Sequence, residues 1–207
     1  MSLDSATQVL AVRHGETDWN LAGRIQGHSD IGLNERGLWQ AQRLADALAD
    51  EVLAAIYCSD LSRAVQTAQP LAQRLGLPLR CDKGLRERSF GAFEGLHWAE
   101  IAAQWPEQSE RWHRRDPLFA ADGGESLQEL HARVLSTAEL LAKNHPGQQI
   151  LLLAHGGVMD TLFRHATHAA LDVSRSWELG HARINRLLRS DEGWRVIAWG
   201  DGRHLES

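Results

Sequence analysis

Two short apolar runs, far apart in the sequence, each lead directly into a histidine. Residues 9–12 (Val-Leu-Ala-Val) precede Arg13-His14-Gly15, and residues 150–154 precede His155-Gly156-Gly157. Continuous apolar runs of this length are typical of strands that are buried on both faces of a parallel sheet. In open α/β sheets, ligands bind beyond the carboxyl ends of such strands. The pattern therefore predicts two buried strands that deliver their histidines to one site.

Strand-like and helix-like segments alternate along the rest of the chain. Further strands are expected at 54–58 and 77–81, and 184–188 with 194–199 should form a closing hairpin. Helices are predicted where a capping residue or helical spacing marks them: after Asn34, around Arg63, at 97–104, at 106–115, after the capping-box pair Ser126 and Glu129, and at 158–168. The alternation predicts a three-layer α/β/α sandwich with a mostly parallel central sheet.

Two segments lack a strand pattern. Residues 18–32, which include Gly23, Gly27 and Gly32, are expected to form a loop over the sheet edge. Residues 84–125 are expected to be a helical cap insertion over the same edge. Because no linker or repeat divides the sequence, we expect one domain over residues 1–207.

The composition narrows the class of function. A formal net charge of −5 argues against a nucleic-acid binder that works by neutralising phosphates. No apolar stretch approaches the ~18 residues that a membrane span needs, and the first residues show no secretory signal. Cys58 and Cys81 give no disulfide framework. A cytoplasmic protein is therefore expected, with neither nucleic acid nor membrane as a partner.

Five polar residues follow the four leading strands in turn. They are Arg13 and His14, Arg63, Glu87, and His155. If those strands are parallel, the side chains converge on one crevice. Two guanidinium groups, two imidazoles and one carboxylate fit phosphoryl transfer, in which a dianion is held and a leaving oxygen is protonated.

Five motifs, in the same order, resemble the histidine phosphatase superfamily, also called the phosphoglycerate-mutase-like family. They are Arg13-His14-Gly15-Glu16-Thr17 with Asn20, Ser62-Arg63-Ala64-Val65-Gln66-Thr67-Ala68, Glu87 with Phe90-Gly91, Glu94-Gly95, and His155-Gly156-Gly157. The resemblance runs from about residue 8 to the tail. It implies a mixed sheet between helices with a helical cap, and phosphoryl transfer through a phosphohistidine without a metal or a cofactor.

The residue chemistry and the resemblance together suggest roles. His14 is the expected nucleophile, with its other ring nitrogen held by a nearby backbone carbonyl. Glu87 is the expected general acid, with Glu16, Glu94 and Glu125 as rivals. His155, expected to be protonated, completes the catalytic set. The expected substrate-binding residues are Arg13, Asn20, Arg63 and Gly156.

Several residues have a structural alternative. Asn20 could instead form an Asx-turn, and Arg63 could pair with Asp60 on a helix surface. Trp98, Trp105 and Trp112 recur every seven residues, which favours packing of the cap over a substrate platform. His165 and His168 are three residues apart, a spacing that metal sites use, but no third ligand is placed beside them, so no metal site is expected.

The sequence favours a phosphatase over a mutase. Mutases of this family show His-Tyr where this chain has Ser89-Phe90, and they carry a basic insertion that residues 114–126 lack. Segments 23–27 and 89–95 look more like the small broad-specificity phosphatase branch, which includes the α-ribazole phosphatases. The segment His181-Ala182-Arg183 departs from that branch, where Asn-x-Ser is frequent.

The expected activity is therefore that of a metal-independent phosphomonoesterase acting on a small phosphorylated metabolite. A cofactor-dependent phosphoglycerate mutase is the alternative, and a non-catalytic phosphate binder is a third hypothesis. An exposed sheet edge would permit a homodimer.

Overall fold

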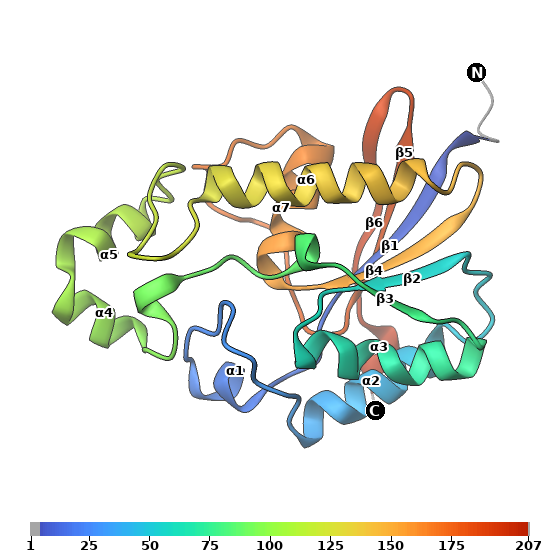
Figure 1. Ribbon diagram of the computed structural model, residues 1–207, viewed down its shortest axis with the longest axis horizontal. Coiled ribbons are helices and arrows are strands. Elements are labelled where there is room, and N and C mark those ends of the chain that lie inside the picture. Colours follow the sequence, from blue (N-terminus) through green and yellow to red (C-terminus); the bar gives the residue numbers. More distant parts are fainter. Residues whose placement is uncertain (1–4, 207) are drawn as a thin grey trace.

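A six-stranded sheet in the order β3-β2-β4-β1-β5-β6 forms the centre of the protein (Figure 1). The computed structural model describes residues 5–206. Strands β1 to β4 are parallel, whereas β5 is antiparallel to β1 and β6 is antiparallel to β5. The strands span Thr7–Arg13 (β1), Ala55–Cys58 (β2), Leu79–Cys81 (β3), Gln149–Ala154 (β4), Ile184–Ser190 (β5) and Gly193–Asp201 (β6). The mostly parallel sheet that the sequence predicts is confirmed.

Helices cover both faces of this sheet (Figure 1). Helices α2 (Glu35–Ala47) and α3 (Ser62–Leu75) lie on one face, and α6 (Leu127–Lys143) and α7 (Gly156–Thr167) lie on the other. Alternate residues of β4 enter the two cores: Leu151 and Leu153 pack toward α2 and α3, and Ile150 and Leu152 pack toward α6 and α7. This double burial explains the continuous apolar run.

Helices α4 (Trp98–Gln104) and α5 (Pro106–His113) form the cap, which lies beyond one end of the sheet (Figure 1). The cap has a small apolar core of its own, which includes Phe93, Ile101 and Phe119. The ring centroids of Trp98 and Trp112 are 5.0 Å apart, and Trp105 packs on Phe93. The expected packing role of these tryptophans is confirmed.

The 18–32 segment differs from the expected loop because it begins with a short helix, α1 (Asp18–Ala22). Thr17 and Asn20 form a capping box, and Gly23, at a φ of 73°, ends the helix. None of the five helical residues is buried, so there is no apolar face for a sequence pattern to reveal. Some boundaries also shift: β3 begins at Leu79 rather than residue 77, α5 ends at His113 rather than residue 115, and α7 begins at Gly156 rather than residue 158.

Within residues 5–206, no helix is both long and apolar enough to cross a membrane. Cys58 is buried in the core and Cys81 is exposed, and both are free thiols.

A capping box stabilises the start of α6. Ser126 Oγ accepts a hydrogen bond from the Glu129 N–H at 3.1 Å, and Glu129 Oε2 accepts one from the Ser126 N–H at 2.8 Å. Ser126→Ala should lower the free energy of unfolding by about 1 kcal/mol, because the Glu129 N–H loses its hydrogen bond to Ser126 Oγ. Urea unfolding measures the change. Ser136→Ala, at an exposed position inside the same helix, should cause no loss. Equal losses in both variants would contradict the capping role.

Candidate active site

The parallel strands bring the predicted residues to one edge of the sheet. Arg13 ends β1, Arg63 lies in the first turn of α3 after β2, Glu87 follows β3, and His155 caps α7 after β4. A cavity of about 160 Å³ opens there and is lined by Arg13, His14, Asn20, Arg24, Ile25, Gln26, Gly27, Arg63, Glu87 and Phe90. His155 is fully buried beside it, with its ring centroid 5.1 Å from that of His14.

His14 is a buried imidazole with a fixed tautomer. Its Nδ1 lies 2.6 Å from the Gly15 carbonyl oxygen, so Nδ1 carries the proton and Nε2 keeps its lone pair. The expectation that a backbone carbonyl holds this ring is confirmed. Burial lowers the pKa of His14 well below its ordinary value, and His155, Arg13 and Arg63 add to the effect. His14 is therefore neutral at physiological pH, as a nitrogen nucleophile must be.

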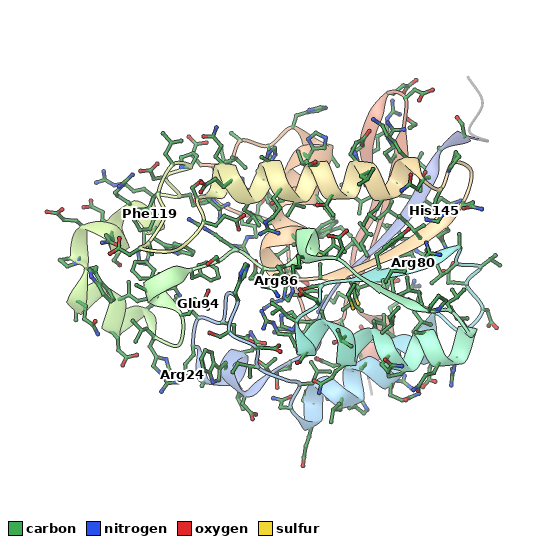
Figure 2. All side chains as sticks on the ribbon, viewed as in Figure 1. Arg24, Arg80, Arg86, Glu94, Phe119 and His145 are labelled. Atoms are coloured by element: carbon green, nitrogen blue, oxygen red, sulfur yellow. The ribbon has the colours of Figure 1, made fainter. Side chains whose placement is uncertain are left out.

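Arg63 is held by backbone carbonyls rather than by a carboxylate. Its Nη1 and Nη2 donate to the carbonyls of Ser29 at 2.8 Å and Gly27 at 2.7 Å. Its side chain is fully buried, and its Nε has no hydrogen-bond partner within residues 5–206. The alternative of a pair with Asp60 is wrong, because both Asp60 oxygens accept from Arg86, at 2.6 and 2.7 Å; Arg86 is labelled in Figure 2.

Arg13 is held in the same way. Its Nη1 donates to the Leu179 carbonyl at 2.6 Å, and its buried Nε is unpaired in the described part of the chain. Burial lowers the pKa of Arg13 to about 10, against the opposing effect of Glu87, so the group stays charged at neutral pH. The site thus holds the fully buried Arg63 and the half-buried Arg13, both bound to backbone carbonyls, an arrangement that suits an anionic ligand.

His155 differs from the expectation of a protonated ring. Burial lowers its pKa well below the ordinary value, and Arg63 and Arg13 lower it further. Both ring nitrogens lack a hydrogen-bond partner within residues 5–206. Burial first, and the two neighbouring guanidinium groups after it, make a positive charge on this ring unfavourable, so His155 is neutral.

Glu87 is fixed by the start of α7. Its carboxylate accepts from the Gly157 N–H at 3.0 and 3.2 Å, and from the Arg88 N–H at 2.8 Å. A Cβ on Gly157 would lie 2.2 Å from Glu87 Oε1, so any larger residue here would displace the Glu87 carboxylate from this position.

The three rival carboxylates have other partners. Glu16 accepts from the Asn34 side chain, and Glu125 pairs with Arg133 at 2.7 Å. Glu94, labelled in Figure 2, accepts from the backbone N–H groups of His28 and Ser29. Of these four glutamates, only Glu87 lines the cavity.

Asn20 and Gly156 contact the site in different ways. Asn20 lines the cavity while its Oδ1 accepts from the Thr17 N–H and hydroxyl, at 3.2 and 3.0 Å, so a capping box replaces the Asx-turn alternative. Gly156 is the first residue of α7, and a Cβ there would lie 3.6 Å from Arg13 Nε. It lines a second cavity that adjoins the first.

Three residues contact the backbone of the site although the sequence did not predict this role for them. His181 Nδ1 lies 3.0 Å from the His14 carbonyl oxygen, and its ring centroid is 5.4 Å from that of His14. His28 Nε2 lies 2.8 Å from the Glu87 carbonyl oxygen, and Thr67 Oγ1 accepts from the Gly15 N–H at 2.9 Å. The one signal in the sequence was the position of Thr67, one helical turn after Arg63.

No group of three histidine, cysteine, aspartate or glutamate residues in the described chain is placed to hold a metal ion. His165 lies near His131, with ring centroids 6.1 Å apart, and His168 ends α7 at a φ of 58°.

The buried imidazoles make stability sensitive to acid. His14 and His155 have pKa values well below 6.5 in the folded chain, and the ordinary value when unfolded. Above about pH 6.5 both states hold the rings neutral; below it the unfolded chain takes up protons that the folded chain excludes. The free energy of unfolding should therefore fall as pH drops below about 6.5.

Urea unfolding at a series of pH values from 7.5 to 5 measures the slope of the free energy of unfolding against pH. His155→Asn should reduce it, by little at pH 7.5 and by up to about 1.4 kcal/mol per pH unit near pH 5, because one excluded proton is removed. His168→Asn, the same substitution at an exposed position, is the matched control. Parallel curves for the wild type and His155→Asn would contradict a neutral buried His155.

Comparison with known proteins agrees with the geometry. A family model described as the histidine phosphatase superfamily (branch 1) matches residues 9–202. A metal-independent phosphoserine phosphatase of Arabidopsis thaliana is 38% identical over 204 residues, covering 97% of this chain and 84% of that protein. Phosphoglycerate mutase-like protein 4 of the same plant is 37% identical over 202 residues, covering 96% and 87%. The solved structure of Bacillus stearothermophilus YhfR aligns with a TM-score of 0.91 at 31% identity, covering 97% of this chain and 100% of that one. The chain belongs to the histidine phosphatase superfamily.

Proposed function

We propose that this protein is a metal-independent phosphomonoesterase that transfers the phosphoryl group of a small phosphorylated metabolite to His14 and then to water. One observation carries the proposal: a neutral His14, with its Nε2 lone pair free, lines one cavity with the guanidinium groups of Arg13 and Arg63, which are held by backbone carbonyls. The chain's similarity to a metal-independent phosphoserine phosphatase supports it.

In the first step, His14 Nε2 attacks the phosphorus and the ester P–O bond breaks. The leaving oxygen takes a proton from the protonated Glu87 carboxyl group, which becomes a carboxylate. Arg13 and Arg63 hold the phosphoryl oxygens while charge spreads over them, with further contacts from His155, Asn20 and Gly156. The alcohol departs, and a phosphohistidine remains.

In the second step, the Glu87 carboxylate takes a proton from a water molecule, and the water oxygen attacks the phosphorus. The P–N bond breaks, the electron pair returns to Nε2, and inorganic phosphate leaves. Glu87 is then protonated again. The arginines supply the positive charge that a metal ion supplies in other phosphoryl-transfer sites.

A phosphoglycerate mutase would share the first step and then return the phosphoryl group to a second hydroxyl. The similarity to a phosphoglycerate mutase-like protein favours this candidate. Against it, residues 114–125 pass from the end of α5 to the start of α6 without a basic insertion that would hold a second substrate group.

A cytoplasmic location and a homodimer also belong to the proposal. Strand β6 is an outer strand of the sheet and carries the exposed side chain of Ile197. An unpaired edge with an apolar side chain supports pairing with a second copy.

A ³¹P NMR time course with 3-phosphoglycerate, phosphoserine and a trace of 2,3-bisphosphoglycerate, in the presence of EDTA, separates the two activities. Inorganic phosphate should be the main product, and His14→Ala should reduce its release to background. Formation of 2-phosphoglycerate without inorganic phosphate would show a mutase and contradict the proposal.

A further inference from the structure

A second cavity of about 200 Å³ adjoins the phosphoryl site. Arg13, Glu87 and Phe90 line both cavities. On the proposed function, on which this inference rests, Glu87 protonates the leaving oxygen, so the leaving group must extend from that carboxyl group. The second cavity is therefore the place for the leaving group. Its lining is part apolar, with Trp112, Leu127, Leu130 and Leu179, and part charged, with Arg88, Arg115, Asp160 and Arg175.

Charged groups gather at one part of this second cavity. Asp160, on the first turns of α7, contacts three guanidinium groups: Arg115 Nη2 at 2.8 Å, Arg164 Nε at 2.9 Å and Arg175 Nε at 3.3 Å. One carboxylate therefore faces three arginines. This leaves an excess of positive charge beside the leaving-group cavity.

Two of the three arginines have structural partners. Arg164 is buried over the Trp177 ring, at 4.7 Å, and donates to the carbonyls of Ala170 and Val173. Arg115 donates to the Leu171 carbonyl at 2.9 Å and to Asp160 at 2.8 Å. Both guanidinium groups thus anchor the 170–173 segment.

Arg175 is different. Its side chain is 40% exposed, it lines the second cavity, and its contact at Asp160 is the long 3.3 Å approach through Nε. This contact is an ion pair and not a hydrogen bond, because Asp160 Oδ1 has no hydrogen-bond partner within residues 5–206. Asp160 thus lies beside the Nε of Arg175 without hydrogen-bonding to it, and the exposed guanidinium group is accessible to a ligand in the second cavity.

We propose that Arg175 binds a carboxylate of the leaving group, so that the substrates are phosphate monoesters of small hydroxy acids. A planar guanidinium matches the two oxygens of a carboxylate in a bidentate pair. Arg88 also lines this cavity, but it is buried and donates to the carbonyls of Glu125 and Phe119. Of the arginines in the lining, Arg175 is the one whose side chain is exposed, so it can fix the leaving group's orientation. Arg175 is then a specificity-determining residue.

Esters that differ by the carboxylate test this directly. The pairs are phosphoserine with phosphoethanolamine, 3-phosphoglycerate with glycerol 3-phosphate, and phosphoglycolate with methyl phosphate; kcat/KM is measured for each. The wild type should prefer the acid in at least one pair. In that pair, Arg175→Gln should lower kcat/KM for the acid by roughly 10- to 150-fold and leave its partner within about twofold.

Two further variants control the experiment. Arg175→Lys keeps the charge without the fork and should give an intermediate loss. Arg195→Gln, which removes an exposed arginine from β6, should change neither substrate. Thermal unfolding checks that Arg175→Gln is folded, and its unchanged rate on the ester without a carboxylate shows that the phosphoryl site is intact.

Three results would overturn the inference. The first is no preference for the acid in any pair, and the second is an equal loss for both esters in Arg175→Gln. The third is faster turnover of phosphoethanolamine than of phosphoserine, which would point to an amine at Asp160. Failure of the proposed function gives a separate signature, since the wild type would then release no phosphate from 4-nitrophenyl phosphate either.

Discussion

Arg13 and Arg63 keep their positive charges inside the protein because backbone carbonyls, rather than carboxylates, accept their hydrogen bonds. A direct carboxylate partner would compete with a phosphate for the same nitrogens. Burial, and after it the two charges, favour neutral rings at His14 and His155, so the arrangement that suits an anion also keeps His14 neutral, as the proposed nucleophile must be. When a phosphate dianion enters, it supplies the negative charge that the site lacks, and the penalty on protonating His155 falls.

The rest of the fold supports this arrangement from several directions. Four parallel strands end at one edge, and α7 starts there with two glycines, so that the Gly157 N–H reaches Glu87 without a side chain between them. Glu94 ties the cap to the loop that holds Arg63, because it accepts from the N–H groups of His28 and Ser29. Asp160 connects the cap, through Arg115, with α7 and with Arg175. The same contacts among α7, the cap and the loop that holds Arg63 thus position both the phosphoryl site and the leaving-group cavity.

The sequence was sufficient for the parallel sheet, since the apolar runs of β1 and β4 carry the signal of burial on both faces. It also placed His14, Arg63, Glu87 and His155 at one edge, because each follows a parallel strand. It could not reveal α1, which has no buried face, or the neutral state of His155, which depends on guanidinium groups from other strands. His181 and Arg175 come from the irregular segment after α7, where no periodicity constrains position, so their contacts with the site emerge only in three dimensions.

The most direct test of the account is capture of the phosphohistidine. Glu87→Gln, mixed with 4-nitrophenyl phosphate and quenched in base within the first turnover, should accumulate the intermediate: nitrophenolate leaves without a proton, but hydrolysis lacks its base. Trypsin then releases residues 14–24, which contain His14 as their sole histidine. We predict one phosphoryl group on that peptide. A burst of nitrophenolate with residues 14–24 unmodified, or with the phosphoryl group on the peptide that contains His155, would contradict His14 as the nucleophile.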